Sequence, residues 1–162
     1  MNPLKTSPRA LALGALFAAL VTGATMLSIP VPGFRLYFNL GEGILYTVAL
    51  LFGPRYGAVA GSLGAALGDI LLGYPQWAPF SLVIKGLEGF VVGFLARRAP
   101  RWIALAAGAL VMMGGYTSAA ATLYGPAAAP LEALTDLTQT GIGAALAWIL
   151  VPFLEKHLRK SR

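Results

Sequence analysis

The chain has 162 residues, of which 57% are hydrophobic and 11% are charged, and its formal net charge is +6. Soluble domains are about 45–50% apolar and about 25% charged, so this composition excludes a soluble protein and indicates a membrane protein. The absence of cysteine excludes a disulfide framework, a thiolate metal site and a thiol nucleophile.

Six apolar runs are long enough, or nearly long enough, to cross a bilayer as helices. The stretches between them, such as "GPRYG", "GYPQWAP" and "RRAPRW", have the glycine and proline content of turns. We therefore predict an all-α integral membrane protein, a bundle of six transmembrane helices that forms a single domain over residues 1–162. The predicted spans cover residues 10–29, 37–52, 56–72, 79–95, 102–123 and 136–153.

Basic residues are divided very unevenly between the two ends of the predicted bundle. With the N-terminus in the cytoplasm, both termini and the loops at Arg55 and at residues 97–101 lie on one side. That side then holds all of the twelve Lys and Arg residues except Arg35 and Lys85. Cytoplasmic loops of membrane proteins carry such an excess. The charge therefore predicts cytoplasmic N- and C-termini and gives no reason to expect nucleic-acid binding.

The first span follows a basic start, which also fits a secretory signal peptide. Its apolar run continues to Ile29 without a convincing cleavage site, so we expect the segment to stay as a helix. Small residues let helices approach closely and serve packing within the chain or docking of a partner helix. Two such series run along this span: Ala10, Gly14 and Ala18, and separately Ala15 with Ala19.

Charged residues on the second, third and fourth spans lie at a similar depth. The stretches "EGILYTVALLFGPRY" and "EGFVVGFLARRAPRW" match faintly, and the Pro-Arg near the end of each marks the cytoplasmic boundary. At about 1.5 Å per residue, Glu42 and Glu88 lie about 18 Å above that boundary, and Asp69 and Lys85 about 21–22 Å above it. The same count places Tyr116, Gln139 and Thr140 about 22–25 Å above it, and Asp136 near the outer surface.

This layer of charges has both structural and functional interpretations. A charge in a membrane span costs about 2.5–3.5 kcal/mol and usually faces a protein interior or a water-filled cavity. Lys85 can pair with Glu88 on its own helix face, or with Asp69 to hold two helices together. Glu42 can be an interfacial carboxylate that complements the start of its helix. The functional interpretation is that these residues line a site for a polar solute, open to the outside.

Glycines recur along one face of the third span, at Gly57, Gly61, Gly64 and Gly68. We predict that this face packs closely against neighbouring helices. Catalytic motifs are missing from the sequence: it has no phosphate-binding loop, no H-E-x-x-H or Cys/His cluster and no G-x-S-x-G elbow. We therefore expect neither an enzyme, nor a metal site, nor a cofactor.

The stretch from "YFNLGEG" to "IKGLEGFVVG" carries an ordered set of motifs. These are N-L-G-[DE], G-P-x-x-G, a late Asp in the third span, G-Y-P-x-x-A-P and I-K-G-x-E-G. In this combination the chain resembles the S component, the substrate-binding membrane subunit, of energy-coupling factor (ECF) vitamin transporters, and most closely the riboflavin-type subgroup. Glu42 stands where Asp is expected.

The resemblance implies a multi-pass protein of a bacterial or archaeal cell membrane that captures a vitamin or vitamin precursor from outside. It also implies a transmembrane coupling subunit and two ATP-binding subunits on other chains, which agrees with the missing phosphate-binding loop. Family members dock through an Ala-x-x-x-Ala surface on the first helix, a spacing that Ala15 and Ala19 match. Riboflavin is the first expected substrate, with a pyridoxine-like molecule, a pyrimidine precursor or pantothenate as alternatives.

In the predicted mechanism, Trp77, Tyr74 and Tyr37 cover the apolar face of the ligand. Its polar groups meet the remaining candidate residues, namely Lys85, Glu88, Asp69, Asn39, Glu42, Tyr116 and Gln139. Two other functions stay open. One is a stand-alone secondary transporter in which Asp69 or Glu88 carries a coupling proton, and the other is a membrane enzyme or scaffold subunit whose charges are structural.

Overall fold

The computed structural model describes residues 7–30 and 37–160, and within them it contains six α-helices. This confirms the predicted all-α architecture. An antiparallel two-stranded hairpin and one short 3-10 helix lie in the connections. In chain order the elements are α1 (Pro8–Met26), β1 (Ser28–Pro30), β2 (Tyr37–Asn39), α2 (Gly41–Phe52), α3 (Pro54–Leu71), α4 (Ala78–Leu95), α5 (Arg101–Tyr124), η1 (Pro126–Ala128) and α6 (Ala129–Lys160).

The helices differ from the predicted spans mainly at the hairpin end of the bundle. Spans 10–29 and 37–52 both extend too far, because their facing ends pair as β1 and β2 instead of continuing as helix. Span 136–153 begins too late, since α6 starts at Ala129. Pro126 and Pro130 suggest a loop in the sequence, but proline is tolerated in the first turn of a helix, where its missing N–H is not needed.

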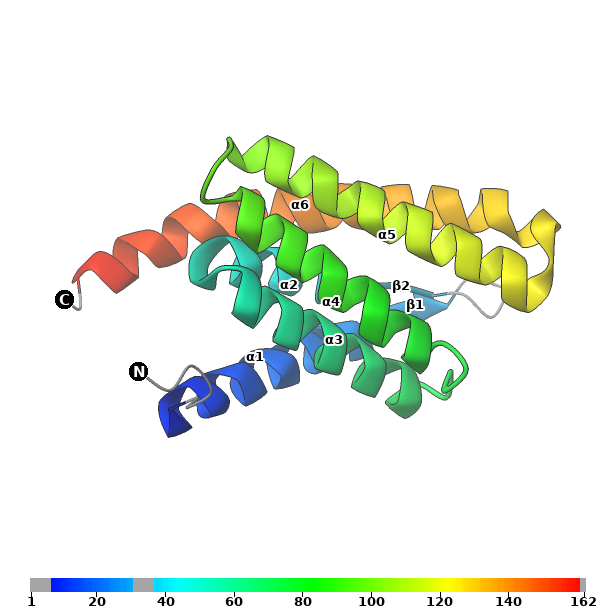
Figure 1. Cartoon of the computed structure of the whole chain (residues 1–162), viewed down its shortest axis with the longest axis horizontal. Coiled ribbons are helices and arrows are strands. Elements are labelled where there is room, and N and C mark those ends of the chain that lie inside the picture. The colour runs from blue at the N-terminus through cyan, green and yellow to red at the C-terminus, as the bar shows by residue number, and fades with distance from the viewer. Residues whose placement is uncertain (1–6, 31–36, 161–162) are drawn as a thin grey trace, which may run out of the picture.

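The six α-helices form a closed ring of neighbours. Around it, α1 packs against α3, α3 against α4, α4 against α5, α5 against α6 and α6 against α2, and α2 closes the ring against α1. The start of α1, the α2–α3 and α4–α5 connections and the end of α6 lie at one end of the bundle, opposite the hairpin (Figure 1). The basic residues around Arg55 and Arg101 therefore belong to the same end.

Glycines let α3 approach its neighbours without intervening side chains. A Cβ atom on Gly57 would collide with the carbonyl oxygen of Gly89 in α4, and one on Gly61 with the carbonyl oxygen of Lys85. Further along α3, Gly64 and Gly68 face α1 in the same way. The predicted packing face is confirmed, and it serves two neighbouring helices rather than one.

Four helices of the described chain are long and apolar enough to cross a membrane: α1, α4, α5 and a stretch from Pro126 to His157 that includes most of α6. Helix α2 is shorter, with 12 residues, and reaches only about 18 Å at 1.5 Å per residue. Its neighbours on the ring, α1 and α6, are longer. Helix α2 ends at Phe52, directly before Gly53. That glycine has φ of +90°, which allows the sharp turn into Pro54 at the start of α3.

Candidate ligand-binding site

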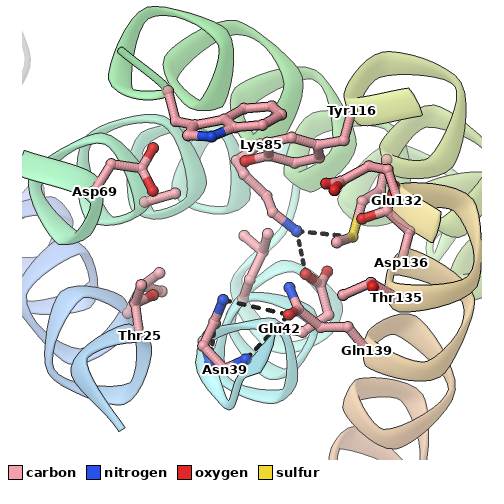
Figure 2. Close-up of a pocket in the computed structure, with 16 residues that line it drawn as sticks. Thr25, Asn39, Glu42, Asp69, Lys85, Tyr116, Glu132, Thr135, Asp136 and Gln139 are labelled. Carbon is pink, nitrogen blue, oxygen red and sulfur yellow. Dashed lines mark hydrogen bonds and ion pairs between the residues drawn. The ribbon is translucent and has the colours of Figure 1, made fainter. Parts of the chain in front are cut away.

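A cavity lies inside the bundle, in the half nearer the hairpin, and holds about 590 Å³ of unoccupied space with its mouth included. Each of the six α-helices contributes to its wall, which is the arrangement expected of a site built inside a helical bundle. Polar residues dominate its labelled lining in Figure 2. The lining residues are Val21, Thr25, Asn39, Gly41, Glu42, Leu45, Ala65, Asp69, Trp77, Lys85, Met112, Tyr116, Glu132, Thr135, Asp136 and Gln139.

Lys85 of α4 is the cation at the centre of a buried charge cluster. Its ammonium forms an ion pair with Glu42 of α2 and a second with Glu88, 3.0 Å away and one turn further along α4. The same nitrogen donates to the sulfur of Met112 at 3.0 Å and lies 5.6 Å from the centre of the Tyr116 ring. Two negatively charged carboxylates therefore surround the Lys85 ammonium, and a buried ion requires such oppositely charged partners.

This cluster decides between the pairings that the sequence leaves open. Lys85 pairs with Glu42 and Glu88, so the alternative in which it pairs with Asp69 is wrong. Glu42 does lie in the first turn of α2, yet it is only 2% exposed and is therefore a buried ion-pair partner rather than an interfacial residue. Asp69 lines the cavity from α3, apart from this cluster (Figure 2).

Glu88 lies behind Lys85 and is absent from the cavity wall. It is fully buried, and the hydroxyl of Tyr46 donates a hydrogen bond to its carboxylate at 2.9 Å. With Lys85 on one side and Tyr46 on the other, its carboxylate faces protein groups. The geometry gives Glu88 the task of holding Lys85 in place, which differs from the direct ligand contact that we predict from the sequence.

A polar bridge joins the hairpin to α6 at the edge of the cavity. The backbone and side-chain N–H groups of Asn39 both donate to the side-chain oxygen of Gln139, at 3.0 and 3.3 Å. The side-chain oxygen of Asn39 accepts from the backbone N–H of Gly41 at 2.8 Å, which satisfies a free donor at the start of α2. Both predicted residues therefore line the cavity and also fix its shape.

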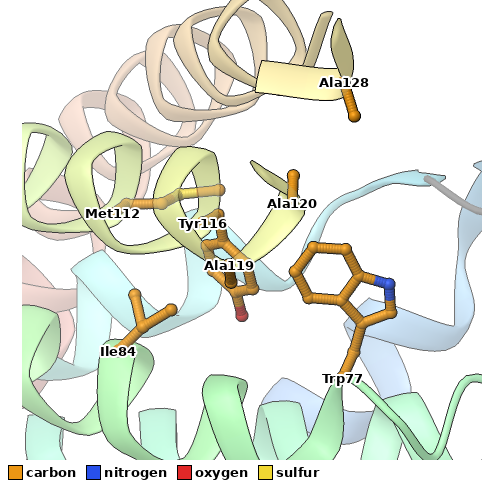
Figure 3. Close-up of a cluster of buried hydrophobic side chains, with 7 residues drawn as sticks. All are labelled: Trp77, Ile84, Met112, Tyr116, Ala119, Ala120 and Ala128. Carbon is orange, nitrogen blue, oxygen red and sulfur yellow. The ribbon is translucent and has the colours of Figure 1, made fainter. Parts of the chain in front are cut away.

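Two aromatic residues of a buried hydrophobic cluster, Trp77 and Tyr116, lie at another side of the cavity, and Figure 3 shows this cluster. Trp77 and Tyr116 both line the cavity, with ring centres 5.7 Å apart. The indole N–H of Trp77 donates to the hydroxyl of Tyr124 at 3.0 Å, and the hydroxyls of Tyr116 and Ser81 are hydrogen-bonded at 2.6 Å. Tyr74 packs against this cluster without lining the cavity. The side chain of Tyr37 lies outside the described part of the structure.

Helix α6 supplies lining residues that sequence reasoning did not assign to the site, namely Glu132, Thr135 and Asp136. Asp136, which the residue count places near the outer surface, is 2% exposed and lies in the cavity wall. Together with Gln139, these residues follow an i, i+3, i+4, i+7 pattern, which places them on one face of a helix. This signal is present in the sequence, but it becomes visible only when the helix begins at Ala129.

Other cavity contributions depend on the three-dimensional arrangement. Thr25 lines the cavity near the end of α1, and Met112 lines it from α5. Thr140 is buried, but its hydroxyl donates to the backbone carbonyl of Asp136. Within residues 7–30 and 37–160 there is no group of three or more His, Asp or Glu side chains placed to hold a metal ion.

The two small-residue series of α1 lie on different faces, about 100° apart around the helix. Gly14 and Ala18 are buried, and Gly14 faces Val59 of α3. Ala15 and Ala19 are exposed on the outside of the bundle. The first series therefore serves packing within the chain, and the second remains available to a partner.

Comparison with known proteins identifies a protein family that matches this chain. Residues 5–156 match the family described as ECF-type riboflavin transporter, S component. A protein of Pyrococcus woesei named "Uncharacterized protein in gap 3'region" is 42% identical over 139 residues, which are 80% of this chain and 93% of that protein. The thiamine precursor transporter HmpT of Lactococcus lactis is 32% identical over 133 residues, which are 81% of this chain and 78% of HmpT.

Proposed function

Because this chain belongs to the family of ECF-type riboflavin transporter S components, we propose that the cavity around Lys85 captures a vitamin or vitamin precursor for import. The family consists of transporter subunits, and the protein is a multi-pass membrane protein of the cell membrane. S components bind a small vitamin-like substrate and act together with an ECF module of coupling and ATPase subunits.

The observation that carries the proposal is the polar cavity itself. Each charged residue in a membrane span costs about 2.5–3.5 kcal/mol, and here Glu42, Asp69 and Lys85 surround one space inside an otherwise apolar bundle. A purely structural ion pair needs no cavity beside it. Polar side chains around an enclosed space, with aromatic rings on one wall, suit a small planar ligand that has hydrogen-bonding edges.

Two names indicate the substrate class. The family description names riboflavin, and the name of the Lactococcus lactis relative gives a thiamine precursor. Both are planar nitrogen heterocycles, which would lie against Trp77 and Tyr116 and present their polar edges to the charged residues. We therefore propose a nitrogen heterocycle of the vitamin or vitamin-precursor type, of which riboflavin is one candidate.

Transport by reconstituted protein tests this function. Proteoliposomes containing this chain with the coupling subunit and both ATPase subunits from the same genome are expected to take up the heterocycle only when ATP is supplied to the ATPases. Omission of the ATPases is the control. Uptake by this chain alone that is abolished by collapsing the proton gradient would instead establish the stand-alone transporter.

Docking to the coupling subunit provides a further prediction. We propose that α1 docks through Ala15 and Ala19, at the end of the bundle that carries the basic residues and that we place in the cytoplasm. Replacing either alanine with tryptophan is expected to prevent the complex with the coupling subunit, because the large ring removes the close approach that small residues allow. Ligand binding should stay unchanged, since both side chains point away from the cavity.

Co-purification with a tagged coupling subunit measures this effect. Ala106→Trp is the matched control, because Ala106 is also an exposed alanine but lies on α5. Equal recovery of the complex from Ala15→Trp, Ala19→Trp and Ala106→Trp would refute the assignment of the docking face to α1.

A further inference from the structure

Two carboxylates in the first two turns of α6, those of Glu132 and Asp136, lie in the cavity wall. The ligand contacts proposed so far give them no role. Glu132 and Asp136 are four residues apart, so their side chains lie on one helix face. Glu132 is 6% exposed and Asp136 is 2% exposed, and both line the cavity. Figure 2 shows both on the same side of the cavity, across from Asp69.

Unlike Glu42 and Glu88, these two carboxylates form no ion pair with Lys85 in the described structure. One oxygen of Glu132 and one of Asp136 are buried without a hydrogen-bond partner in the part of the chain that the structure describes. Lys85 donates to Glu42 and to Met112 and forms its second ion pair with Glu88. The neighbouring hydroxyl of Thr135 donates to the backbone carbonyl of Leu131 at 3.0 Å. Both residues line the cavity, so the protein leaves acceptor groups of this pair without a donor at the cavity wall.

Buried polar groups in folded proteins are almost always hydrogen-bonded, and an unmatched carboxylate is especially unfavourable. The missing donors at Glu132 and Asp136 are therefore expected to come from the molecule that fills the cavity. An ionised carboxylate only accepts hydrogen bonds, so the groups that match it are N–H or O–H donors.

We propose that Glu132 and Asp136 form a subsite that binds N–H donors of the ligand and selects heterocycles with an amino group over those with a carbonyl oxygen at that position. The subsite rests on the proposed capture function. It adds which chemical groups the ligand presents along one of its edges. Two carboxylates one helical turn apart suit an exocyclic amino group, as in an aminopyrimidine, because that group carries two N–H donors. A carbonyl oxygen at that position supplies no donor to either carboxylate.

Such a site discriminates strongly, because a ligand without the donor loses its hydrogen bonds and leaves buried acceptors unpaired. Sites built around substrate OH or NH groups reject analogues that lack them by factors of about 10⁴–10⁵. We expect at least about 100-fold of that factor here.

Calorimetric titration of the detergent-purified full chain tests the subsite with three probes. They are 4-amino-5-hydroxymethyl-2-methylpyrimidine, the analogue with an oxo group at position 4, and riboflavin. The wild type is expected to bind the amino probe about 100-fold or more tightly than the oxo probe. Glu132→Gln and Asp136→Asn should each weaken binding of the amino probe about tenfold or more, because an amide accepts a weaker hydrogen bond than a carboxylate.

Glu155→Gln is the matched control. Glu155 is also on α6, but it pairs with Arg101 at 2.7 Å, far from the cavity, so its loss should leave the affinity unchanged. Thermal melting of each variant verifies that it is folded, and the amino-to-oxo ratio of the wild type does not depend on any variant.

The possible results separate this subsite from the proposed function. Tight binding of the amino probe by wild type and both variants alike would overturn the subsite and leave the capture function standing. Equal affinity for the amino and oxo probes, or binding of riboflavin alone, would do the same. A folded wild type that binds no vitamin or precursor would overturn both.

Discussion

Replacing Lys85 with methionine is expected to reduce ligand affinity about 100-fold or more, which corresponds to about 2.8 kcal/mol at 1.4 kcal/mol per factor of ten. Methionine is of similar length and apolar, so the substitution removes the charge while largely filling the space. Glu42 and Glu88 then lose their cation in a buried site. Breaking a buried pair from one side costs about 3–5 kcal/mol, so the bundle should also melt at a lower temperature.

Tryptophan fluorescence measures the affinity of this variant. Trp77 lines the cavity and is 4% exposed, whereas Trp102 and Trp148 are 63% and 56% exposed. A bound aromatic ligand should therefore quench mainly Trp77, and Trp77→Phe verifies the origin of the signal.

The double variant Lys85→Met with Glu42→Gln should recover part of the lost stability without recovering the affinity, because fewer carboxylates are left unpaired. Unchanged affinity in a folded Lys85→Met variant would contradict the assignment of Lys85 to the site.

Gly57→Ala is expected to produce a large loss of stability for a single-methyl addition, about 3 kcal/mol by comparison with other overpacked cores. Its Cβ atom would collide with the carbonyl oxygen of Gly89, and that oxygen belongs to the backbone of α4 and cannot rotate away. The two helices would have to separate. Because Lys85 lies one turn before Gly89 on the same helix, ligand binding should weaken as well.

Thermal unfolding in detergent checks this prediction against two matched glycine-to-alanine controls. A Cβ atom at Gly114 or Gly141 meets nothing within 4 Å, so alanine is accommodated there. Alanine favours helix over glycine by about 1 kcal/mol, so both controls should be neutral or slightly stabilised. A melting temperature for Gly57→Ala equal to those of the controls would show that α3 and α4 are not held at backbone contact.

Much of the fold follows from local properties of the sequence. The lengths of the apolar runs and the proline and glycine residues between them predict six helices, and the glycine face of α3 predicts close packing. The hairpin is different, because its strands are only three residues long and are defined by pairing with each other. The start of α6 is obscured by Pro126 and Pro130, which are typical of loops and of first helical turns alike.

The site could be predicted only as far as depth along each helix can indicate it. A count of residues from the membrane boundary places Glu42, Asp69 and Lys85 in one layer, and all three line the cavity. The rotation of each helix determines which side chains then meet. This rotation pairs Lys85 with Glu42 rather than Asp69, and it turns Glu88 toward Tyr46. Such contacts depend on packing across helices, which residue spacing along one helix does not determine.

Native mass spectrometry of the detergent-purified protein tests most directly whether the cavity around Lys85 holds a vitamin-type ligand. The wild type, as purified or after addition of riboflavin and the aminopyrimidine, is expected to carry one small-molecule adduct per chain. Lys85→Met should lose that adduct, and Ala15→Trp should retain it. A folded wild type that remains at its bare mass, or equal occupancy in the wild type and Lys85→Met, would contradict ligand capture at this site.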